Sequence, residues 1–379
     1  GALLDSFPIP PEGLLGGGTT LHRHYSNEPD NRFKQMATNI APASAQPFML
    51  GRRLHHTDFG DGTHSEQPNP AYSEQVGKLG PDYIARSCVA CHVNNGRSLP
   101  PAIGADMLQS VVRVGIDASG TPHPVLGAVL QPRNTGGAAE GSATISSYTT
   151  TGGQFGDGTA YSLQAPVYAF TGTPPSHFSV RIAPQQVGLG LLEAVSETSV
   201  LALADPDDAD GDGSSGRIRT VDGPESGQPR LGRFTSKGGM ARLKHQIAGA
   251  LNTDMGVRTT IFPQLDGETT PGQPELDDAA LSDLTRYVAT LGVPPRRDLT
   301  DPEALQGEQL FAAASCVKCH TPTFTTSSFH PVTELRNQVI HPYTDLLLHD
   351  MGPGLADTMG EGDAAGSEWR TPPLWGIGL

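Results

Sequence analysis

Apolar residues recur at helical spacing most clearly in the stretch 274–291. Steps of three and four residues place them on one face of a helix. They are Leu281, Leu284, Val288 and Leu291. Gly292 and the pair Pro294-Pro295 follow directly, and both residue types end helices. The pattern therefore predicts an amphipathic helix followed by a linker.

Three further stretches are predicted to be helical, at 47–56, 238–252 and 302–311. In the second, the apolar residues again share one face, namely Met240, Leu243, Ile247 and Leu251. In the third, Glu303 lies in the first turn, where a negative charge is favoured by the helix dipole.

Glycine and proline interrupt the pattern elsewhere. The chain of 379 residues contains 46 Gly and 33 Pro, and 36% of its residues are hydrophobic. So many breakers predict short helices between long ordered loops. Residues 1–45 are expected to form an extended N-terminal arm, and the Gly-, Ser- and Thr-rich stretch 135–160 is expected to form hairpins or ordered loop.

The four cysteines all lie in two Cys-x-x-Cys-His motifs. The motif residues are Cys88, Cys91 and His92, and Cys316, Cys319 and His320. Two thiols at this spacing can form thioethers to the vinyl groups of one porphyrin, and the adjacent histidine can bind the iron. We therefore predict two covalently attached c-type haems, with His92 and His320 as proximal ligands.

Two other uses of the cysteines stay open. Two Cys-x-x-Cys pairs can build one zinc site, although here they lie more than 200 residues apart and each has a histidine that a zinc ribbon does not need. A thioredoxin-like dithiol needs a helix running on from the motif, whereas the residues at 93–101 are typical of a loop.

The surroundings of both motifs resemble cytochrome c modules, in which a Gly-x-x-Leu-Phe helix precedes the haem motif. Residues 307–311 match that pattern, residues 47–56 resemble it, and 274–291 resembles a closing helix. The resemblance implies a mainly α fold of two cytochrome c-like haem domains with long ordered loops and a few short strands. The expected divisions are an arm at 1–45, a first haem domain with a large insertion at 46–293, and a second at 298–379 that lacks its C-terminal part.

With these pieces placed, the chain resembles the di-haem oxidoreductase family often labelled "thiol oxidoreductase". That family is related to the bacterial di-haem cytochrome c peroxidases and to the di-haem enzyme of methylamine utilisation. Beside the two motifs, the resemblance is most specific at 188–195, 205–217, 341–357 and 370–376. The thiol label has no support here, because every cysteine is assigned to haem.

The resemblance implies a periplasmic peroxidase-like oxidoreductase. One haem, expected to be the first, would have an open distal side for peroxide, and the second haem would pass electrons to it. Glu193 is the residue most similar to the peroxidase glutamate that moves the peroxide proton. Its neighbours in 188–195 are mostly apolar, so its pKa is expected to be raised, unless it is a simple exposed helix residue.

The densest run of acids, 205–213, suggests a calcium site. Asp208, Asp210 and Asp212 match the first three ligand positions of a calcium loop, and Gly213 matches its turning glycine. Arg219 stands where the closing glutamate would be, so this is not a complete EF-hand loop. Two interpretations stay open: a calcium site whose remaining ligands come from elsewhere in the chain, and an acidic loop that is exposed to solvent.

The distal ligands are less clear from the sequence. In the related peroxidases, a distal histidine follows the first motif, and His123 is the first histidine after His92 here. Met351 and His349 are candidate metal ligands at the second haem, because the usual ligand lies in a C-terminal part that this sequence does not contain.

The net charge and the hydropathy of the chain limit the classes of partner that we expect. A net charge of −15 disfavours nucleic acid, and no apolar run approaches the length of a membrane span. The start at Gly1 is interpreted as mature or trimmed, with any signal peptide removed. Covalent haem attachment takes place outside the bacterial inner membrane, which indicates a periplasmic protein. The expected partners are a small redox protein as electron donor and peroxide or a similar small oxidant.

Two other functions compete with the peroxidase. A pure di-haem electron-transfer cytochrome would have both irons closed by strong ligands. A maturation enzyme would act on another protein at long range through a surface tryptophan, for which Trp369 and Trp375 are the candidates, although a structural role is favoured for each.

Overall fold

The computed structural model describes residues 9–22 and 30–379. Helices account for 24% of the structure and strands for 20%, so the expectation of a mainly α fold is wrong. The difference comes from the long insertion after the first motif, where Thr, Val, Ile and Tyr favour strands. Every helix in the described part of the chain is too short or too polar to cross a lipid bilayer.

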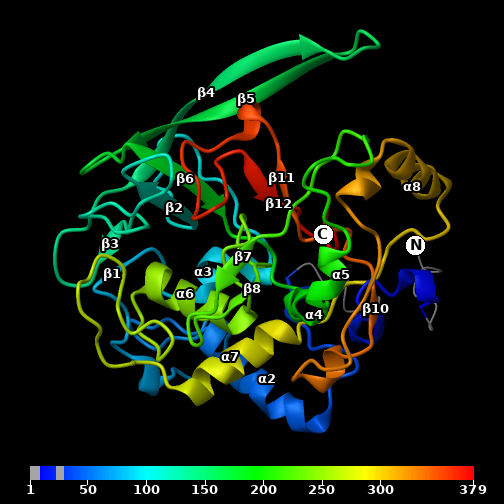
Figure 1. The fold of residues 1–379 in the computed structure, drawn as a ribbon. Helices are drawn as coiled ribbons and strands as arrows, with labels where there is room; N and C mark the ends of the chain where they lie inside the picture. The colour runs from blue at the N-terminus through cyan, green and yellow to red at the C-terminus, as the bar shows by residue number, and fades with distance from the viewer. Residues whose placement is uncertain (1–8, 23–29) are drawn as a thin grey trace.

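The strands form separate two-stranded antiparallel sheets (Figure 1). The longest pair is β4 (Ala143–Gln154) with β5 (Ala160–Phe170), and β2 (Ser110–Gly115) pairs with β6 (His177–Ile182). The short pairs are β1 (Asp82–Tyr83) with β3 (Arg133–Asn134), β7 (Thr220–Asp222) with β8 (Pro229–Leu231), β9 (Phe324–Thr325) with β10 (Val339–Ile340), and β11 (Leu348–Asp350) with β12 (Glu368–Arg370).

The helices begin and end close to where the sequence pattern places them. Asp277 and Asp301 cap α7 and α8 by accepting backbone N–H groups, which explains why each helix starts there. The helices are α2 (Pro42–His55), α3 (Cys88–Cys91), α4 (Leu189–Ala194), α5 (Glu197–Leu201), α6 (Leu243–Met255), α7 (Asp278–Ala289) and α8 (Pro302–Ala313).

Helices α2 and α7 cross at very close range. A Cβ atom on Gly51 of α2 would lie 2.0 Å from the carbonyl oxygen of Asp283 in α7, so only glycine allows the approach. Phe48 packs edge-on against Tyr287, with ring centroids 4.9 Å apart. Tyr287 of α7 also contacts Asn95, shortly after the first Cys-x-x-Cys-His motif, with its hydroxyl 3.0 Å from the amide nitrogen.

Helix α8 lacks such a partner within the described residues. None of its residues is buried, and Leu310 is 59% exposed. Gly307 occupies the position in Gly-x-x-Leu-Phe that Gly51 occupies before the first motif, but its Cβ position meets open space. The two modules therefore share a helix pattern but not its packing.

The largest apolar core contains residues from both expected haem domains. Leu191 and Leu192 of α4 pack there with Leu335, Leu347 and Trp375. Residues 1–8 and 23–29 of the expected N-terminal arm lie outside the described residues, and the remainder of the arm pairs with the stretch after α7 through bridges from Thr20 and Met36.

Alanine at the two equivalent glycines should have opposite effects on stability. Gly51→Ala should lower the free energy of unfolding by roughly 1–3 kcal/mol, because α2 and α7 must move apart. Gly307→Ala should raise it by about 0.5–1 kcal/mol, because alanine is the better helix former and meets open space. Urea titration of both variants checks this, and a loss at Gly307 would contradict the exposed face of α8.

Candidate functional site

The first motif is held in place by a carbonyl from a distant segment. Helix α3 is a single turn, and His92 follows it directly. The Nδ1–H of His92 lies 2.7 Å from the carbonyl oxygen of Pro184 and donates to it. That bond fixes the ring and its tautomer and leaves Nε2 without a hydrogen bond to any described residue. A lone pair on Nε2 is what an iron ligand requires.

The second motif repeats this arrangement with unrelated surroundings. Cys316 opens a single 3-10 turn, and His320 follows it. The Nδ1 atom of His320 lies 2.8 Å from the carbonyl oxygen of Tyr343. The ring of Phe311, from α8, lies 6.0 Å from the imidazole. Both motifs therefore present a histidine whose orientation is fixed by a remote backbone oxygen.

The segments that supply these two carbonyls are linked by a third segment. Gln185, next to Pro184, donates its side-chain N–H to the carbonyl of Trp375. The backbone N–H of Leu374 donates to the carbonyl of Pro342, next to Tyr343, at 2.9 Å. A continuous route of covalent and hydrogen bonds therefore runs between the two motifs through Leu374 and Trp375.

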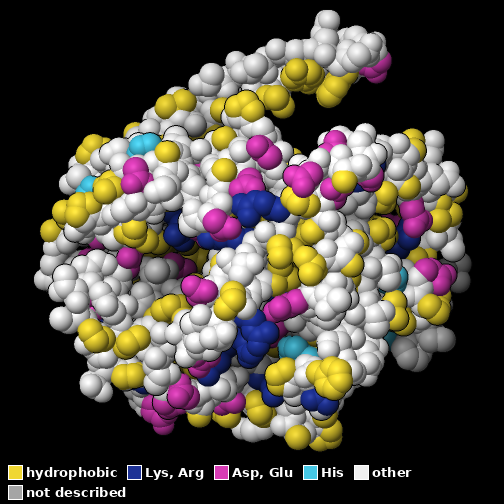
Figure 2. Space-filling model, in the orientation of Figure 1, with side chains coloured by type: hydrophobic (Ala, Val, Ile, Leu, Met, Phe, Trp, Pro, Cys, Tyr) yellow, Lys and Arg dark blue, Asp and Glu magenta, His cyan; other side chains and the backbone are white. Residues whose placement is uncertain are grey.

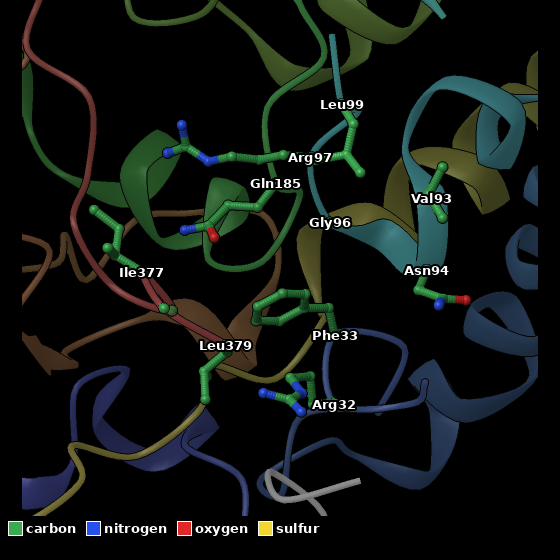
Figure 3. Close-up of a pocket in the computed structure, with 12 residues that line it drawn as sticks. Arg32, Phe33, Val93, Asn94, Gly96, Arg97, Leu99, Gln185, Ile377 and Leu379 are labelled. Atoms are coloured by element: carbon green, nitrogen blue, oxygen red, sulfur yellow. The ribbon is translucent and has the colours of Figure 1, made fainter. Parts of the chain in front are cut away.

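A pocket of about 450 Å³ lies beside the first motif (Figure 3). Arg97 and Gln185 extend into it from one side, and Arg32 and Phe33 line the opposite side. The Nε of Arg32 is buried and has no hydrogen-bond partner. Such a set of cationic and apolar groups suits a flat apolar molecule that carries carboxylates.

A second pocket, of about 400 Å³, lies beside the second motif. It is lined by Phe311 and Tyr343, by Arg296 and by the buried side chain of Trp375. Gly376, Ile377 and Leu379 line both pockets, so the segment that follows Trp375 lies between them.

His55 is a residue that the sequence reasoning missed. It is fully buried, and neither ring nitrogen makes a hydrogen bond of good geometry to a described residue, although Gln186 lies beside the ring. Burial together with the nearby His56 and His92 lowers its pKa well below the usual value. The sequence did contain a signal for this residue. In the helix pattern Gly-x-x-Leu-Phe before the second motif, the last position is Phe311, whereas before the first motif the same position is His55.

A buried polar chain begins next to this histidine. The phenol of Tyr287 lies 3.3 Å from Nε2 of His56 and 3.0 Å from the amide nitrogen of Asn95, which follows the first motif. Burial lowers the pKa of His56 to about 4, so its ring is neutral at pH 7. Glu66, paired with Arg52, lies 3.9 Å from the other side of that ring. The chain therefore runs from the surface to the segment after His92.

Glu193 lies on α4, and the hydrogen bonds of its carboxylate are to residues outside both motifs. Its carboxylate accepts the backbone N–H of Leu243, the first residue of α6, at 3.0 Å, and lies 3.2 Å from Nε2 of His330. Burial raises its pKa, but the hydrogen bonds from His330 and Leu243 outweigh that effect, so the pKa is lowered. The expected rise in pKa is therefore wrong, because the residues beside it in sequence are not the groups that surround its carboxylate.

The candidate distal ligands occupy different environments. His349 is buried, with Nε2 2.7 Å from Asp345 and Nδ1 3.6 Å from the sulfur of Cys319. Burial lowers its pKa, but the bond to Asp345 outweighs this and raises the pKa to about 10. Met351 is 50% exposed. His123 accepts two backbone N–H groups of its own turn.

The acidic run packs against the second motif. Asp205, Asp208 and Asp210 bring their carboxylates within 4.8 Å of one another. Asp212, expected to be a third ligand, instead pairs with Lys318 at 2.6 Å, inside the Cys316–His320 motif. The structure thus keeps Asp208 and Asp210 together but replaces Asp212 with Asp205.

Neither tryptophan is a freely exposed ring. Trp375 is 1% exposed. Trp369 lies between two cations, with Lys237 Nζ 4.0 Å and Arg181 Cζ 4.5 Å from the ring centroid. These two positive charges over the Trp369 ring disfavour the loss of an electron from its indole.

Comparison with protein families gives a match over residues 175–379 to the family described as "Di-haem oxidoreductase, putative peroxidase". The match includes the second motif and excludes the first. No curated protein and no solved structure matches the chain. Because the family match covers more than half of the 379 residues, this chain belongs to the di-haem oxidoreductase family, as its sequence resemblance implied.

Proposed function

We propose that this protein is a periplasmic di-haem c-type oxidoreductase that reduces peroxide or a similar small oxidant. Electrons from a small redox protein would enter at the haem of Cys316–His320 and pass to the haem of Cys88–His92. The observation that carries the proposal is the paired arrangement of His92 and His320, each with Nδ1 bonded to a remote carbonyl. When bound, haem supplies the redox-active iron that reacts with the oxidant.

The residues present fit covalent haem at both motifs. In each motif the thiols and the histidine lie within or directly beside one short turn, so the same few residues would hold the porphyrin and bind its iron. Arg32 and Arg97 in the first pocket, and Arg296 in the second, are placed to hold propionate carboxylates. The unpartnered Nε of Arg32 supports this assignment, because a buried guanidinium nitrogen normally has an acceptor.

The Trp375 segment supports electron transfer between the sites. It contacts the carbonyl-bearing segments of both motifs, through Gln185 on one side and Pro342 on the other. The indole of Trp375 is buried and belongs to the largest apolar core, so the route passes through the interior of the protein. A short bonded route through a rigid interior is favourable for electron transfer and leaves no need for an exposed aromatic ring.

Glu193 and His330 form the candidate proton-transfer pair. His330 Nδ1 accepts the N–H of Val332, so Nε2 carries the proton that faces Glu193. Glu193 is ionised because its pKa is lowered, and an ionised carboxylate beside an imidazole can accept and return a proton. The role of Glu193 in peroxide chemistry rests on its resemblance to the peroxidase glutamate.

The acidic run supports a proposed calcium site next to the second haem. Asp205, Asp208 and Asp210 supply oxygen ligands of the kind calcium prefers. The same loop contacts the second motif through Asp212 and through Ser214, whose hydroxyl lies 3.5 Å from the sulfur of Cys319. A bound ion would therefore stabilise the surroundings of that haem.

Selective removal of each haem should separate their roles. In a host that attaches haem, intact mass should show the 39.8 kDa chain with two haems, and the Cys88→Ser/Cys91→Ser and Cys316→Ser/Cys319→Ser variants with one each. Loss of the first haem should remove the high-spin signal and peroxide turnover. Loss of the second should keep the high-spin signal and slow electron delivery. Two low-spin haems and no turnover in the intact protein would favour an electron-transfer cytochrome.

Glu193→Gln should lower peroxide turnover by roughly 10²-fold or more, because a positioned base contributes that much to proton transfer. The amide oxygen can still accept the N–H of Leu243, so both haem spectra and the melting temperature should change little. Glu197→Gln, on exposed α5, is the matched control. Unchanged turnover with a lowered melting temperature would assign Glu193 to the support of α6 alone.

Calcium should stabilise the fold through the carboxylates that the structure brings together. At 100 times the dissociation constant, calcium should add about 2.7 kcal/mol to the free energy of unfolding. Asp208→Asn should remove most of this gain, whereas Asp207→Asn, just outside the cluster, should keep it. Calorimetry of chelated and calcium-loaded protein makes the comparison, and equal melting curves would identify a solvated loop.

A further inference from the structure

A tyrosine and a histidine meet inside the protein where α2 and α7 cross. Tyr287 of α7 is 0% exposed, and its phenol oxygen lies 3.3 Å from Nε2 of His56, which directly follows α2 and is 1% exposed. Both rings lie in the interior, beneath a surface of mixed acidic, basic and hydrophobic side chains over α2 and α7 (Figure 2). A phenol hydrogen-bonded to an imidazole can lose an electron and a proton together, because the imidazole is a base within reach.

The hydrogen bonds around the pair agree on one arrangement of protons. The side-chain N–H of Asn95 donates to the phenol oxygen at 3.0 Å, so the phenol proton is free to be donated to Nε2 of His56. The other ring nitrogen of His56, Nδ1, then carries the ring proton and faces the hydroxyl of Ser65 at 2.9 Å. In this arrangement Nε2 is the atom to which the phenolic proton can move.

The charges near His56 help its ring to hold that proton. Burial lowers the pKa of His56 to about 4, so the ring is neutral before the transfer. The carboxylate of Glu66 lies 3.9 Å from Nδ1 and stabilises a protonated ring more than any other charged group, although Arg52 and Lys34 act against it. Burial raises the pKa of Glu66, but the hydrogen bond from Arg52 outweighs this and lowers the pKa to about 2, so the carboxylate is ionised.

The phenol keeps its proton until the ring is oxidised. Burial raises the pKa of Tyr287 well above its ordinary value, so a phenolate does not form at neutral pH. A phenol that has lost an electron is by contrast a strong acid, and the neutral ring of His56 is then basic enough to accept the proton. Loss of the electron and transfer of the proton are therefore coupled at this pair.

Two hydrogen bonds connect the pair to the first Cys-x-x-Cys-His motif. The backbone N–H of Asn95 donates to the carbonyl of His92 at 2.8 Å, and the side chain of the same Asn95 contacts the phenol of Tyr287. The ring of His55 also lies 5.2 Å from the ring of Tyr287. A single residue, Asn95, therefore links the proposed proximal histidine to the phenol, and a haem at this motif is an oxidant to which Tyr287 has a short bonded route.

We propose that Tyr287 is a redox-active tyrosine that gives one electron to the first haem after peroxide has oxidised that haem. The phenolic proton moves to Nε2 of His56 in the same step. The products are a neutral tyrosyl radical, a protonated His56 and a haem with one electron more. The inference rests on the proposed function, because peroxide is the source of the oxidising power. The radical holds one oxidising equivalent until an electron arrives from the second motif, and the proton then returns from His56 to the phenol.

Tyr72 offers a matched comparison close to the same helix. The guanidinium of Arg53, a residue of α2, lies over its ring, with Cζ 3.8 Å from the ring centroid. A positive charge in that place disfavours the loss of an electron from the ring. Tyr287 instead packs edge-on against Phe48. Oxidation is therefore expected at Tyr287 and not at Tyr72.

Freeze-quench electron paramagnetic resonance of the peroxide-treated holoprotein tests the proposal. The wild type should give a tyrosyl radical signal, which Tyr287→Phe should lose and Tyr72→Phe should keep. His56→Gln still offers an acceptor to the phenol but cannot take its proton. In that variant, radical formation should be slower by roughly 10²-fold or more, because a positioned base contributes that much to a proton transfer. A wild-type signal in Tyr287→Phe, or a wild-type rate in His56→Gln, would overturn the proposal.

Optical spectra of the same samples separate this result from the proposed function. If peroxide changes the haem spectra but no tyrosyl radical forms, the tyrosine proposal fails and the peroxide-reducing function stands. If peroxide leaves the spectra unchanged, the proposed function fails, and a ruthenium photo-oxidant replaces peroxide in the same comparison. A radical that forms in the wild type and is missing from Tyr287→Phe then still supports a redox-active pair, whereas no radical in the wild type refutes it. Resting haem spectra and circular dichroism of the three variants should match the wild type.

Discussion

The site depends on one kind of interaction, the hydrogen bond from a motif histidine to the carbonyl of a distant residue. Each Cys-x-x-Cys-His motif is a single turn and cannot orient its own imidazole. Pro184 and Tyr343 supply the two carbonyls. The imidazoles of His92 and His320 are therefore oriented only after these later segments of the chain have folded against the motifs. In the proposed function, the same hydrogen bonds would make both imidazoles more basic ligands for iron. The folding of the long insertion is therefore a condition for a correctly built first site.

A second set of contacts keeps the insertion and the C-terminal region together. Arg217 and Arg219 form ion pairs with Glu368 and Asp363, although these residues are more than 140 positions away in sequence. The ammonium of Lys237 is buried and donates to three backbone carbonyls between residues 365 and 368. Because unpaired buried charges are costly, these contacts fix the segments that carry β11, β12 and Trp369 in one arrangement.

In the proposed function, the same packing would let the two motifs exchange electrons without a surface aromatic. Trp375 belongs to the largest core cluster and the segment that follows it lies between the two pockets, while its backbone neighbours contact the segments behind both histidines. Trp369 is held between Arg181 and Lys237, which makes its oxidation unfavourable. Electron transfer through the interior between the two motifs is therefore better supported than oxidation of another protein through a surface tryptophan.

The sequence by itself determined the local features: the two Cys-x-x-Cys-His motifs, the family, and helices α7 and α8, whereas α2 begins five residues before the predicted start. These follow from periodicity, capping residues and spacing, which act within one or two turns of chain. Only the tertiary structure decided the strand content of the insertion, the neighbours of Glu193, the pairing of Asp212 with Lys318, and the burial of His55. Each of these depends on groups far away in sequence. A carboxylate's pKa and ligands are set by whatever the returning chain places beside it, and no local pattern encodes that contact.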